Sequence, residues 1–354
     1  MKTAGLHAES RVVQTGRTVR AVFLMLCICV TAVPGPAAAS GLFSLEGDAR
    51  AHWTEREDPA AELDVIAVSI RKTLADRTGD RWMLSAMLEF QDDLSEVMLH
   101  EAYVRFKGPM GKWNITTGRF QLPFGLLSSY STNRQLYDGL TDATAGLHAD
   151  GGILVSGVLG DLDYGLALTQ GRGVHDDPDL HGLDLVSGRA GWTFGDFGDI
   201  AAGVSLLIGT SPAGHGPSGT HSNDFSGSET GEHSDTHENM PGDTRLDRWI
   251  VGLDATVYAG LWLTRWEFQT GEIGSDAFAG GFIMAEYPVL PRLDLTGSLR
   301  VTHIDRETTA NLYLGFSHSS PWFTIRGGYT YDRFKTDYSH GVGIQLYRLV
   351  SWPF

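Results

Sequence analysis

The chain has 354 residues, with 27 lysines and arginines against 43 aspartates and glutamates and a formal net charge of −16 at pH 7. Nucleic-acid binding needs a concentrated basic surface, so this balance excludes that class of protein. After residue 39 the sequence has no sustained 3.6-residue apolar period and no long apolar run. We therefore expect one large all-β body rather than a helical one.

The first 39 residues predict a secretory signal peptide that is removed. Four basic residues precede an uninterrupted apolar run at 21–33, and small residues at 37–39 offer a cleavage site after Ala39. A helix of this apolar run rises about 20 Å, which is less than the hydrocarbon core of about 30 Å, so it does not predict a membrane span. The predicted mature chain is residues 40–354.

Both cysteines, Cys27 and Cys29, lie in the predicted leader, so the mature chain has none. This excludes a disulfide scaffold, a thiolate metal site, a catalytic cysteine and a haem-attachment motif, and we expect no cofactor. The leader also holds four of the 27 basic residues and one of the 43 acidic ones. The mature chain therefore carries 23 basic against 42 acidic residues, a net charge near −19.

Strict alternation of apolar and polar side chains begins at residues 43–53 and recurs at 82–90, 249–257 and 293–301. A two-residue period indicates a strand with one apolar and one polar face. Strands of soluble sandwiches are most often about five or six residues long, whereas a tilted membrane strand needs about 9–11. The pattern therefore predicts a transmembrane antiparallel β-barrel.

Segments with strand character number about 16, with 14 or 18 as alternatives. They are 42–53, 62–74, 81–91, 97–107, 112–120, 147–159, 161–170, 183–194, 199–208, 246–259, 261–270, 277–287, 291–302, 309–317, 322–331 and 340–354. The long connections, 121–146, 171–182 and 209–245, all follow odd-numbered segments. Short periplasmic turns and long extracellular loops are typical of barrels in the outer membrane of Gram-negative cells, where lipid and lipopolysaccharide would surround the chain.

Charged residues on the polar faces are candidates for the lumen lining. They are Glu46, Asp48, Arg50, Glu89, Glu101, Arg105, Arg265, Glu267, Asp294 and Arg300. Their signs are mixed and lean negative, which favours a porin that passes small ions and solutes with weak or cation-leaning selectivity. No nucleophile, base and orienting group can be assembled, so we expect no enzyme. The alternative function is a sheath around a partner such as a multihaem cytochrome in an electron conduit.

One local segment is more distinctive: Gly118-Arg119-Phe120-Gln121-Leu122-Pro123-Phe124-Gly125, preceded by Glu-Ala-Tyr-Val at 101–104. It resembles the phosphate-selective porin O/P family, in which G-R-x-x-x-P-F-G opens the third extracellular loop. The resemblance implies a trimeric porin of sixteen strands whose third loop bends inward and narrows the pore. It would place at the constriction Arg119, Gln121, Tyr130, Asn133 and Arg134. The alternative is that Pro123 and Gly125 only turn the chain at the membrane surface.

The mature chain departs from that family in its lysines, of which only four remain. Phosphate selectivity in the family depends on arginine and lysine ladders in the lumen, and four lysines do not supply a lysine ladder. We therefore expect the family's architecture without its substrate.

The last long loop contains four histidines among acidic residues and no basic residue: His215, His221, His233 and His237. Imidazole and carboxylate groups could hold Zn²⁺, Ni²⁺ or Cu²⁺ weakly. Glycine, serine and proline fill the rest of the loop, which favours a plain solvated loop instead.

The chain ends on the aromatic residue Phe354, which shares a face with Val342, Ile344 and Trp352. This pattern resembles the carboxy-terminal signature strand of bacterial outer-membrane proteins, which the barrel-assembly machinery reads. Most tryptophans also fall near predicted strand ends. Such positions are typical of the aromatic girdles at membrane interfaces, where the ring is apolar and its N–H needs water.

Overall fold

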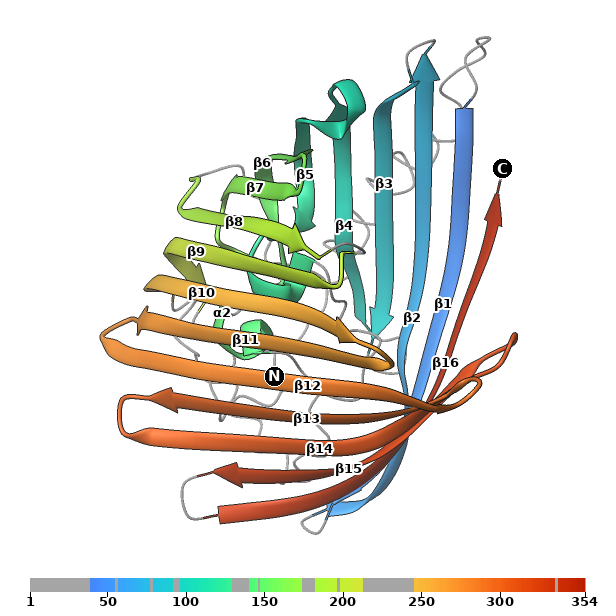
Figure 1. The fold of residues 1–354 in the computed structure, drawn as a ribbon, viewed down its shortest axis with the longest axis vertical. Coiled ribbons are helices and arrows are strands. Elements are labelled where there is room, and N and C mark those ends of the chain that lie inside the picture. The colour runs from blue at the N-terminus through green and yellow to red at the C-terminus, as the bar shows by residue number, and fades with distance from the viewer. Residues whose placement is uncertain are drawn as a thin grey trace, which may run out of the picture.

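The computed structural model describes residues 39–54, 57–76, 79–91, 96–128, 140–145, 147–173, 182–195, 198–212, 245–334 and 337–353. Within these residues, sixteen strands form one closed antiparallel barrel (Figure 1). Each strand pairs with its neighbour in the chain, and β1 closes the ring against β16. The predicted all-β barrel of 16 strands is confirmed.

The described secondary structure consists of these strands and three short helical turns. The strands are β1 Ala39–Thr54, β2 Glu57–Asp76, β3 Gly79–Gln91, β4 Glu96–Lys107, β5 Asn114–Gln121, β6 Ala149–Leu159, β7 Leu162–Thr169, β8 Leu185–Phe194, β9 Ile200–Pro212, β10 Arg245–Ala259, β11 Trp262–Ile273, β12 Asp276–Leu290, β13 Leu293–Ile304, β14 Glu307–Ser319, β15 Thr324–Phe334 and β16 Asp337–Pro353. The helical turns are η1 Pro109–Gly111, η2 Gly125–Ser128 and α2 Leu140–Ala145. No helix in the described part of the chain is long and apolar enough to cross a membrane.

Several strands extend beyond their predicted ends. β2 is the clearest case, because backbone pairing with β1 continues where the side chains no longer alternate. The long connections follow β5, β7 and β9, as predicted, and every connection after an even-numbered strand is short. Short turns also follow β1, β3, β11, β13 and β15. Gly160 and Gly260 lie in two of the turns after even-numbered strands with φ of 65° and 63°, a backbone conformation that glycine adopts without steric cost.

The two faces of the barrel are chemically inverted relative to a soluble protein. On β10, Trp249, Val251 and Leu253 are exposed, whereas Arg248 and Asp254, which flank them in the sequence, are buried. β16 repeats this alternation of exposed apolar and buried polar side chains. Because lipid solvates apolar groups and a water-filled interior solvates polar ones, this inversion is the pattern of a membrane barrel.

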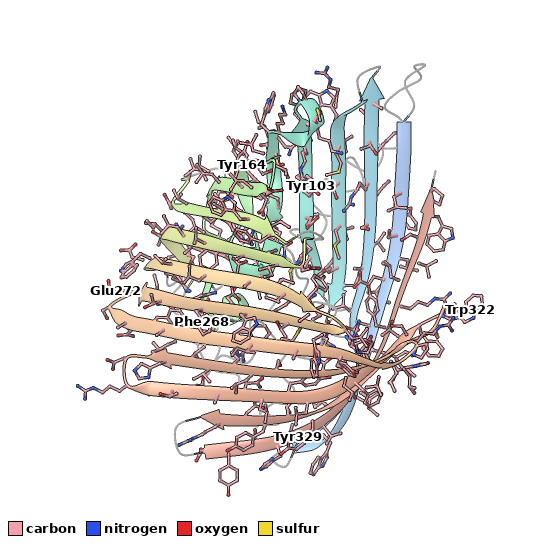
Figure 2. All side chains as sticks on the ribbon, viewed as in Figure 1. Tyr103, Tyr164, Phe268, Glu272, Trp322 and Tyr329 are labelled. Atoms are coloured by element: carbon pink, nitrogen blue, oxygen red, sulfur yellow. The ribbon has the colours of Figure 1, made fainter. Side chains whose placement is uncertain are left out.

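Tryptophans gather on the outer face near the strand ends. The rim that carries the turns after even-numbered strands has the exposed side chains of Trp82, Trp113, Trp192, Trp262, Trp322 and Trp352. Figure 2 shows Trp322 at the turn between β14 and β15. Several of these rings contact other aromatic rings, as between Trp82 and Phe106, whose centroids are 4.8 Å apart. The rim therefore has the aromatic girdle that interfaces favour.

Candidate pore site

The chain that leaves β5 turns into the barrel and follows the inner wall. We call its described residues, 122–128 and 140–145, the third-loop segment. The backbone N–H of Gly125 donates to Ser205 Oγ on β9 at 2.9 Å, and that of Leu126 donates to Glu267 Oε1 on β11 at 3.2 Å. Both acceptors occupy inward positions of their strands, since the neighbouring Leu206 and Phe268 are exposed on the outside.

Glu267 organises the attachment of α2. Thr141 Oγ1 donates to Glu267 Oε1 at 2.7 Å, and Gln269 Nε2 donates to the same oxygen at 3.1 Å. Thr144 Oγ1 donates to Gln269 Oε1 at 2.6 Å, and Arg248 Nη1 donates to the carbonyl of Thr144. Glu267 is 1% exposed, so its hydrogen bonds replace water that the site excludes. The network joins the third-loop segment to β10 and β11.

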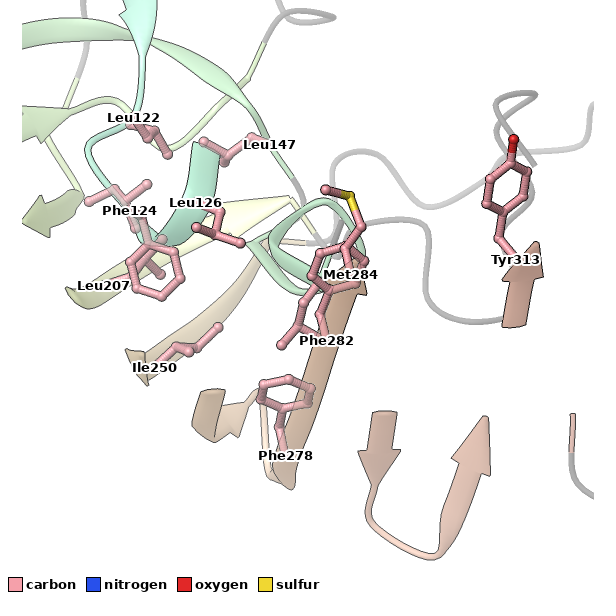
Figure 3. Packing of buried hydrophobic residues seen from close by; sticks show 12 residues of the cluster. Leu122, Phe124, Leu126, Leu147, Leu207, Ile250, Phe278, Phe282, Met284 and Tyr313 are labelled. Carbon is pink, nitrogen blue, oxygen red and sulfur yellow. The ribbon is translucent and has the colours of Figure 1, made fainter. Parts of the chain in front are cut away.

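Apolar packing reinforces these polar contacts. The loop side contributes Leu122, Phe124, Leu126, Leu140 and Leu147, and the wall contributes inward side chains such as Leu207, Ile250 and Phe278 (Figure 3). Burying a side chain of this size stabilises a structure by roughly 1.5–3 kcal/mol. The barrel interior therefore has an apolar seat for the loop on one side, whereas most of its other inward positions are polar.

Glycines on the inner wall let the segment approach the strand backbone. A Cβ at Gly165 on β7 would lie 2.9 Å from Pro123 Cβ. A Cβ at Gly280 on β12 would lie 2.7 Å from Leu140 Cδ1. Real Cβ atoms do not pack at such distances, so a larger residue at Gly165 would displace Pro123, and one at Gly280 would displace the Leu140 side chain.

Strand pairing places Arg119 on the outer face, whereas the family resemblance implied a lumen position. Arg119 pairs with Ala102 on β4 and Gly151 on β6. The next residue, Phe120, packs inward in a buried cluster, and successive strand residues face opposite ways. The Arg119 guanidinium instead donates to the carbonyl of Leu99 at 3.1 Å.

The other predicted constriction residues have different outcomes. Gln121, the last residue of β5, has the strand parity of Arg119, although it is among the residues that line a pocket of the inner wall. The remaining three constriction candidates, Tyr130, Asn133 and Arg134, lie outside the described residues. The same holds for the predicted leader up to residue 38, for Phe354 and for the four loop histidines, His215, His221, His233 and His237. In the described ranges, no group of three or more His, Cys, Asp or Glu side chains could hold a metal ion.

The ten predicted lumen residues all occupy inward positions of their strands. Glu46, Asp48, Arg50, Glu89 and Glu267 are buried, and Glu101, Arg105, Arg265, Asp294 and Arg300 are partly exposed. Many of these charges are compensated locally. Arg50 pairs with Asp48 at 2.9 Å, Gln345 Nε2 donates to Asp48 Oδ2 at 2.6 Å, and Arg265 pairs with Glu286 at 3.5 Å.

A further lumen cluster was missed from sequence. Arg189 on β8 donates through Nη1 to Asp163 on β7 at 2.7 Å. Through Nη2 and Nε it also binds Asp254 on β10 in a bidentate pair at 2.6 and 2.9 Å. Glycines interrupt the alternation of the two shorter strands, which hid Arg189 and Asp163. Asp254 could have been found, because it lies between apolar residues of opposite parity on β10.

No protein-family model matches the sequence, and no curated protein matches it. Among solved structures, the fold is similar to OmpT, an outer membrane protein of Vibrio cholerae in its trimer form. The identity is 12% and the TM-score 0.66, over 88% of this chain and 100% of that one. An anion-selective porin from Comamonas acidovorans has 12% identity and a TM-score of 0.64 over 88% and 100% of the two chains. OmpF of Salmonella typhi, in complex with daunomycin, has 11% identity and a TM-score of 0.60 over 88% and 97%.

These likenesses establish a fold shared with outer-membrane porins. They leave the resemblance to the phosphate-selective porin O/P family unconfirmed, because these structures are only 11–13% identical to the chain. The chain therefore has the porin fold, with a third-loop segment attached to the inside of the barrel.

Proposed function

We propose that this chain is an outer-membrane porin through which small ions and solutes diffuse passively, and that its third-loop segment narrows the passage. The observation that carries the proposal is the attachment of this segment to the inner wall through Glu267 and Ser205. A loop held inside a closed barrel reduces the cross-section available to water and solutes. Its hydrogen bonds to rigid strands keep it there.

The barrel exterior supports the cellular location. The exposed apolar side chains of the outer face need lipid around them. In the outer leaflet, this lipid would be lipopolysaccharide. The proposal includes export through a cleaved leader, recognition of the last strand by the barrel-assembly machinery through Phe354, and assembly as a homotrimer. The trimer form of Vibrio cholerae OmpT is a precedent for this assembly in a barrel of similar fold.

We expect weak or cation-leaning selectivity for small inorganic ions. Lumen charges of both signs lie close together, as in the Arg189 cluster and the Asp48–Arg50 pair. Paired charges produce small fields at the pore axis, and selectivity follows from the remaining field. The mature chain's excess of acidic residues then favours cations slightly.

The pore explains the lumen better than the sheath does. A sheath around a multihaem cytochrome needs an interior that admits a second protein, whereas the third-loop segment and its apolar seat occupy part of this interior. The described lumen residues also give no reason to propose an enzyme, because the buried acids are bonded to loop and wall groups.

Planar-bilayer recording tests the proposal. Residues 40–354 are refolded, and their barrel is verified by faster gel migration before heating than after. The folded protein should open water-filled channels whose reversal potential in a salt gradient is near zero or slightly cation-selective. The boiled protein is the control. Folded barrels that never conduct would contradict the pore, and strong anion selectivity would contradict the assignment of the lumen charges. Outer-membrane location is tested separately by cell fractionation.

A further inference from the structure

The outer face of the barrel has basic and aromatic side chains at one end of β15 and β16. Arg333 on β15 pairs with Tyr338 on β16. Two residues back along β15, Tyr331 pairs with His340. Tyr329, labelled in Figure 2, is exposed on the outside, and the alternation of a strand gives Tyr331 and Arg333 the same direction. We call these five residues, Tyr329, Tyr331, Arg333, Tyr338 and His340, the basic–aromatic patch.

The patch lies where the apolar outer face meets the rim of the barrel. The turn between β15 and β16 follows an odd-numbered strand, as the three long connections do. Val342 and Ile344, the next outward residues after His340 on β16, are exposed and apolar. Long loops of outer-membrane barrels face the cell exterior, so the patch lies at the level of the head groups of the outer leaflet.

Aromatic contacts hold the ring of His340. Its centroid is 5.1 Å from that of Tyr331, 5.7 Å from that of Tyr329 and 6.0 Å from that of Tyr338. The Tyr329 hydroxyl forms a hydrogen bond with His340 Nδ1. When the hydroxyl donates this bond, the other ring nitrogen, Nε2, carries the proton and can donate to an oxygen of a ligand.

Arg333 supplies a full positive charge beside this ring. Its side chain is exposed and has no ion pair with a described residue. The adjacent Asp332 has the opposite strand parity and accepts a hydrogen bond from Asn311 Nδ2 on β14. The guanidinium is therefore available on the outer face, and its fork of donors matches the oxygens of a phosphate group.

Elsewhere on the same rim the outward residues are acidic. Glu272 on β11 pairs with the exposed Trp249 and shares its outward direction, and Asp247 precedes Trp249 by two residues on β10. The mature chain carries a net charge near −19, so the basic–aromatic patch differs in sign from the average surface. A phosphate at this level of the membrane is attracted to the ends of β15 and β16 and repelled from those of β10 and β11.

We propose that the basic–aromatic patch binds a phosphate group of lipopolysaccharide in the outer leaflet. Arg333 and His340 Nε2 contact the phosphate oxygens, and the acyl chains lie along Val342 and Ile344. Tyrosines suit this position, because their rings are apolar and their hydroxyl groups reach the head groups. The proposal rests on the outer-membrane location and orientation given under the proposed function, since lipopolysaccharide occupies only the outer leaflet.

Lipid A, the acylated and phosphorylated anchor of lipopolysaccharide, is the probe. Native mass spectrometry of the folded mature barrel in detergent should detect bound diphosphorylated lipid A. Lipid A with the same acyl chains and no phosphate should bind about tenfold more weakly or less, because it lacks the groups that Arg333 and His340 contact. Inorganic phosphate at the same concentration as the lipid should not displace it, because the acyl chains also contribute to binding.

Substitutions in the patch test the assigned contacts. Arg333→Gln should weaken lipid A binding about fivefold, and Arg333→Lys should retain most of the affinity. His340→Phe keeps a ring among the tyrosines but removes Nε2, and should weaken binding about threefold. The matched control is Arg348→Gln. Arg348 is exposed on the same face of β16 but pairs with Gly47 toward the opposite rim, so this variant should bind lipid A like the unmodified chain.

The proposal is overturned if lipid A without phosphate binds as well as the diphosphorylated form, or if inorganic phosphate displaces the lipid. It is also overturned if Arg333→Gln, migrating as a folded barrel, keeps full affinity, or if Arg348→Gln weakens binding equally. Phosphate-dependent lipid A binding by a barrel that does not conduct would contradict the pore and leave the site standing. Conducting channels that bind both lipids alike would contradict the site and leave the pore standing.

Discussion

Replacing Glu267 with alanine should release the third-loop segment from the wall while the barrel still forms. The substitution removes the acceptor for Thr141 at 2.7 Å, for Gln269 at 3.1 Å and for the backbone N–H of Leu126 at 3.2 Å. None of these bonds belongs to the ladders that close the barrel, so the sheet itself keeps its pairing.

The size of the effect follows from those bonds. A typical hydrogen bond contributes about 0.5–1.5 kcal/mol net, and a buried donor left without a partner costs about 1–3 kcal/mol. Only the bonds from Thr141 and Leu126 attach the loop, because Gln269 lies on the same strand as Glu267. Since these two bonds share one oxygen and do not add fully, we expect the attached state to lose about 2–4 kcal/mol. Each 1.4 kcal/mol is a factor of ten, so the detached population should rise between about 30-fold and about 1,000-fold.

Single-channel recording measures the population of barrels in which the third-loop segment is detached. Glu267→Ala should give a larger mean conductance and frequent transitions between levels. Glu267→Gln keeps an acceptor oxygen and should stay close to the unmodified chain. The matched control is Glu272→Ala, on the same strand but exposed (Figure 2), which should have no effect. If Glu267→Ala and Glu272→Ala give the same conductance and noise, Glu267 does not hold the loop.

Two other substitutions test the outer and inner faces of the barrel, and a third serves as a control for the outer face. Leu253→Arg, in the middle of the exposed apolar face of β10, should destabilise the folded barrel in lipid by about 2–4 kcal/mol, because the charge enters hydrocarbon. Leu261→Arg, in the turn at the rim, should cost almost nothing, and equal urea midpoints in lipid vesicles for the two variants would contradict the assigned membrane position. Arg189→Gln leaves Asp163 and Asp254 without their cation and should shift the reversal potential toward cation selectivity. An unchanged or anion-shifted potential would mean that this cluster does not face the conducting path.

The sequence predicted what is local to each strand. Alternation over residues 249–257 assigns Trp249 and Leu253 to the outside without knowledge of any partner strand, and the structure confirms this assignment. The number of strands could also be predicted from the sequence, because each membrane crossing ends in a turn or loop that interrupts the alternation. Boundaries were less accurate, since backbone pairing continues beyond the part of a strand that contacts lipid.

The position of the third-loop segment inside the barrel depends on contacts between residues far apart in the chain. Gly165, Gly280 and Glu267 lie on three different strands, and only the closed barrel brings them to the same loop. The sequence around Gly165 and Gly280 does not indicate that a loop packs against either glycine. Arg119 illustrates the opposite case, because a motif suggested a lumen position and the register with Ala102 and Gly151 gave it an outward one.

The most direct test of the account compares two loop deletions in planar bilayers. Shortening the chain between Leu126 and Gly146 removes α2 and its bonds to β11, and should raise single-channel conductance several-fold while the barrel still assembles. A deletion of equal length between β9 and β10, within residues 213–243, should change conductance far less. If both deletions raise conductance equally, or if the first leaves it unchanged, the third-loop segment does not set the narrowest part of the pore.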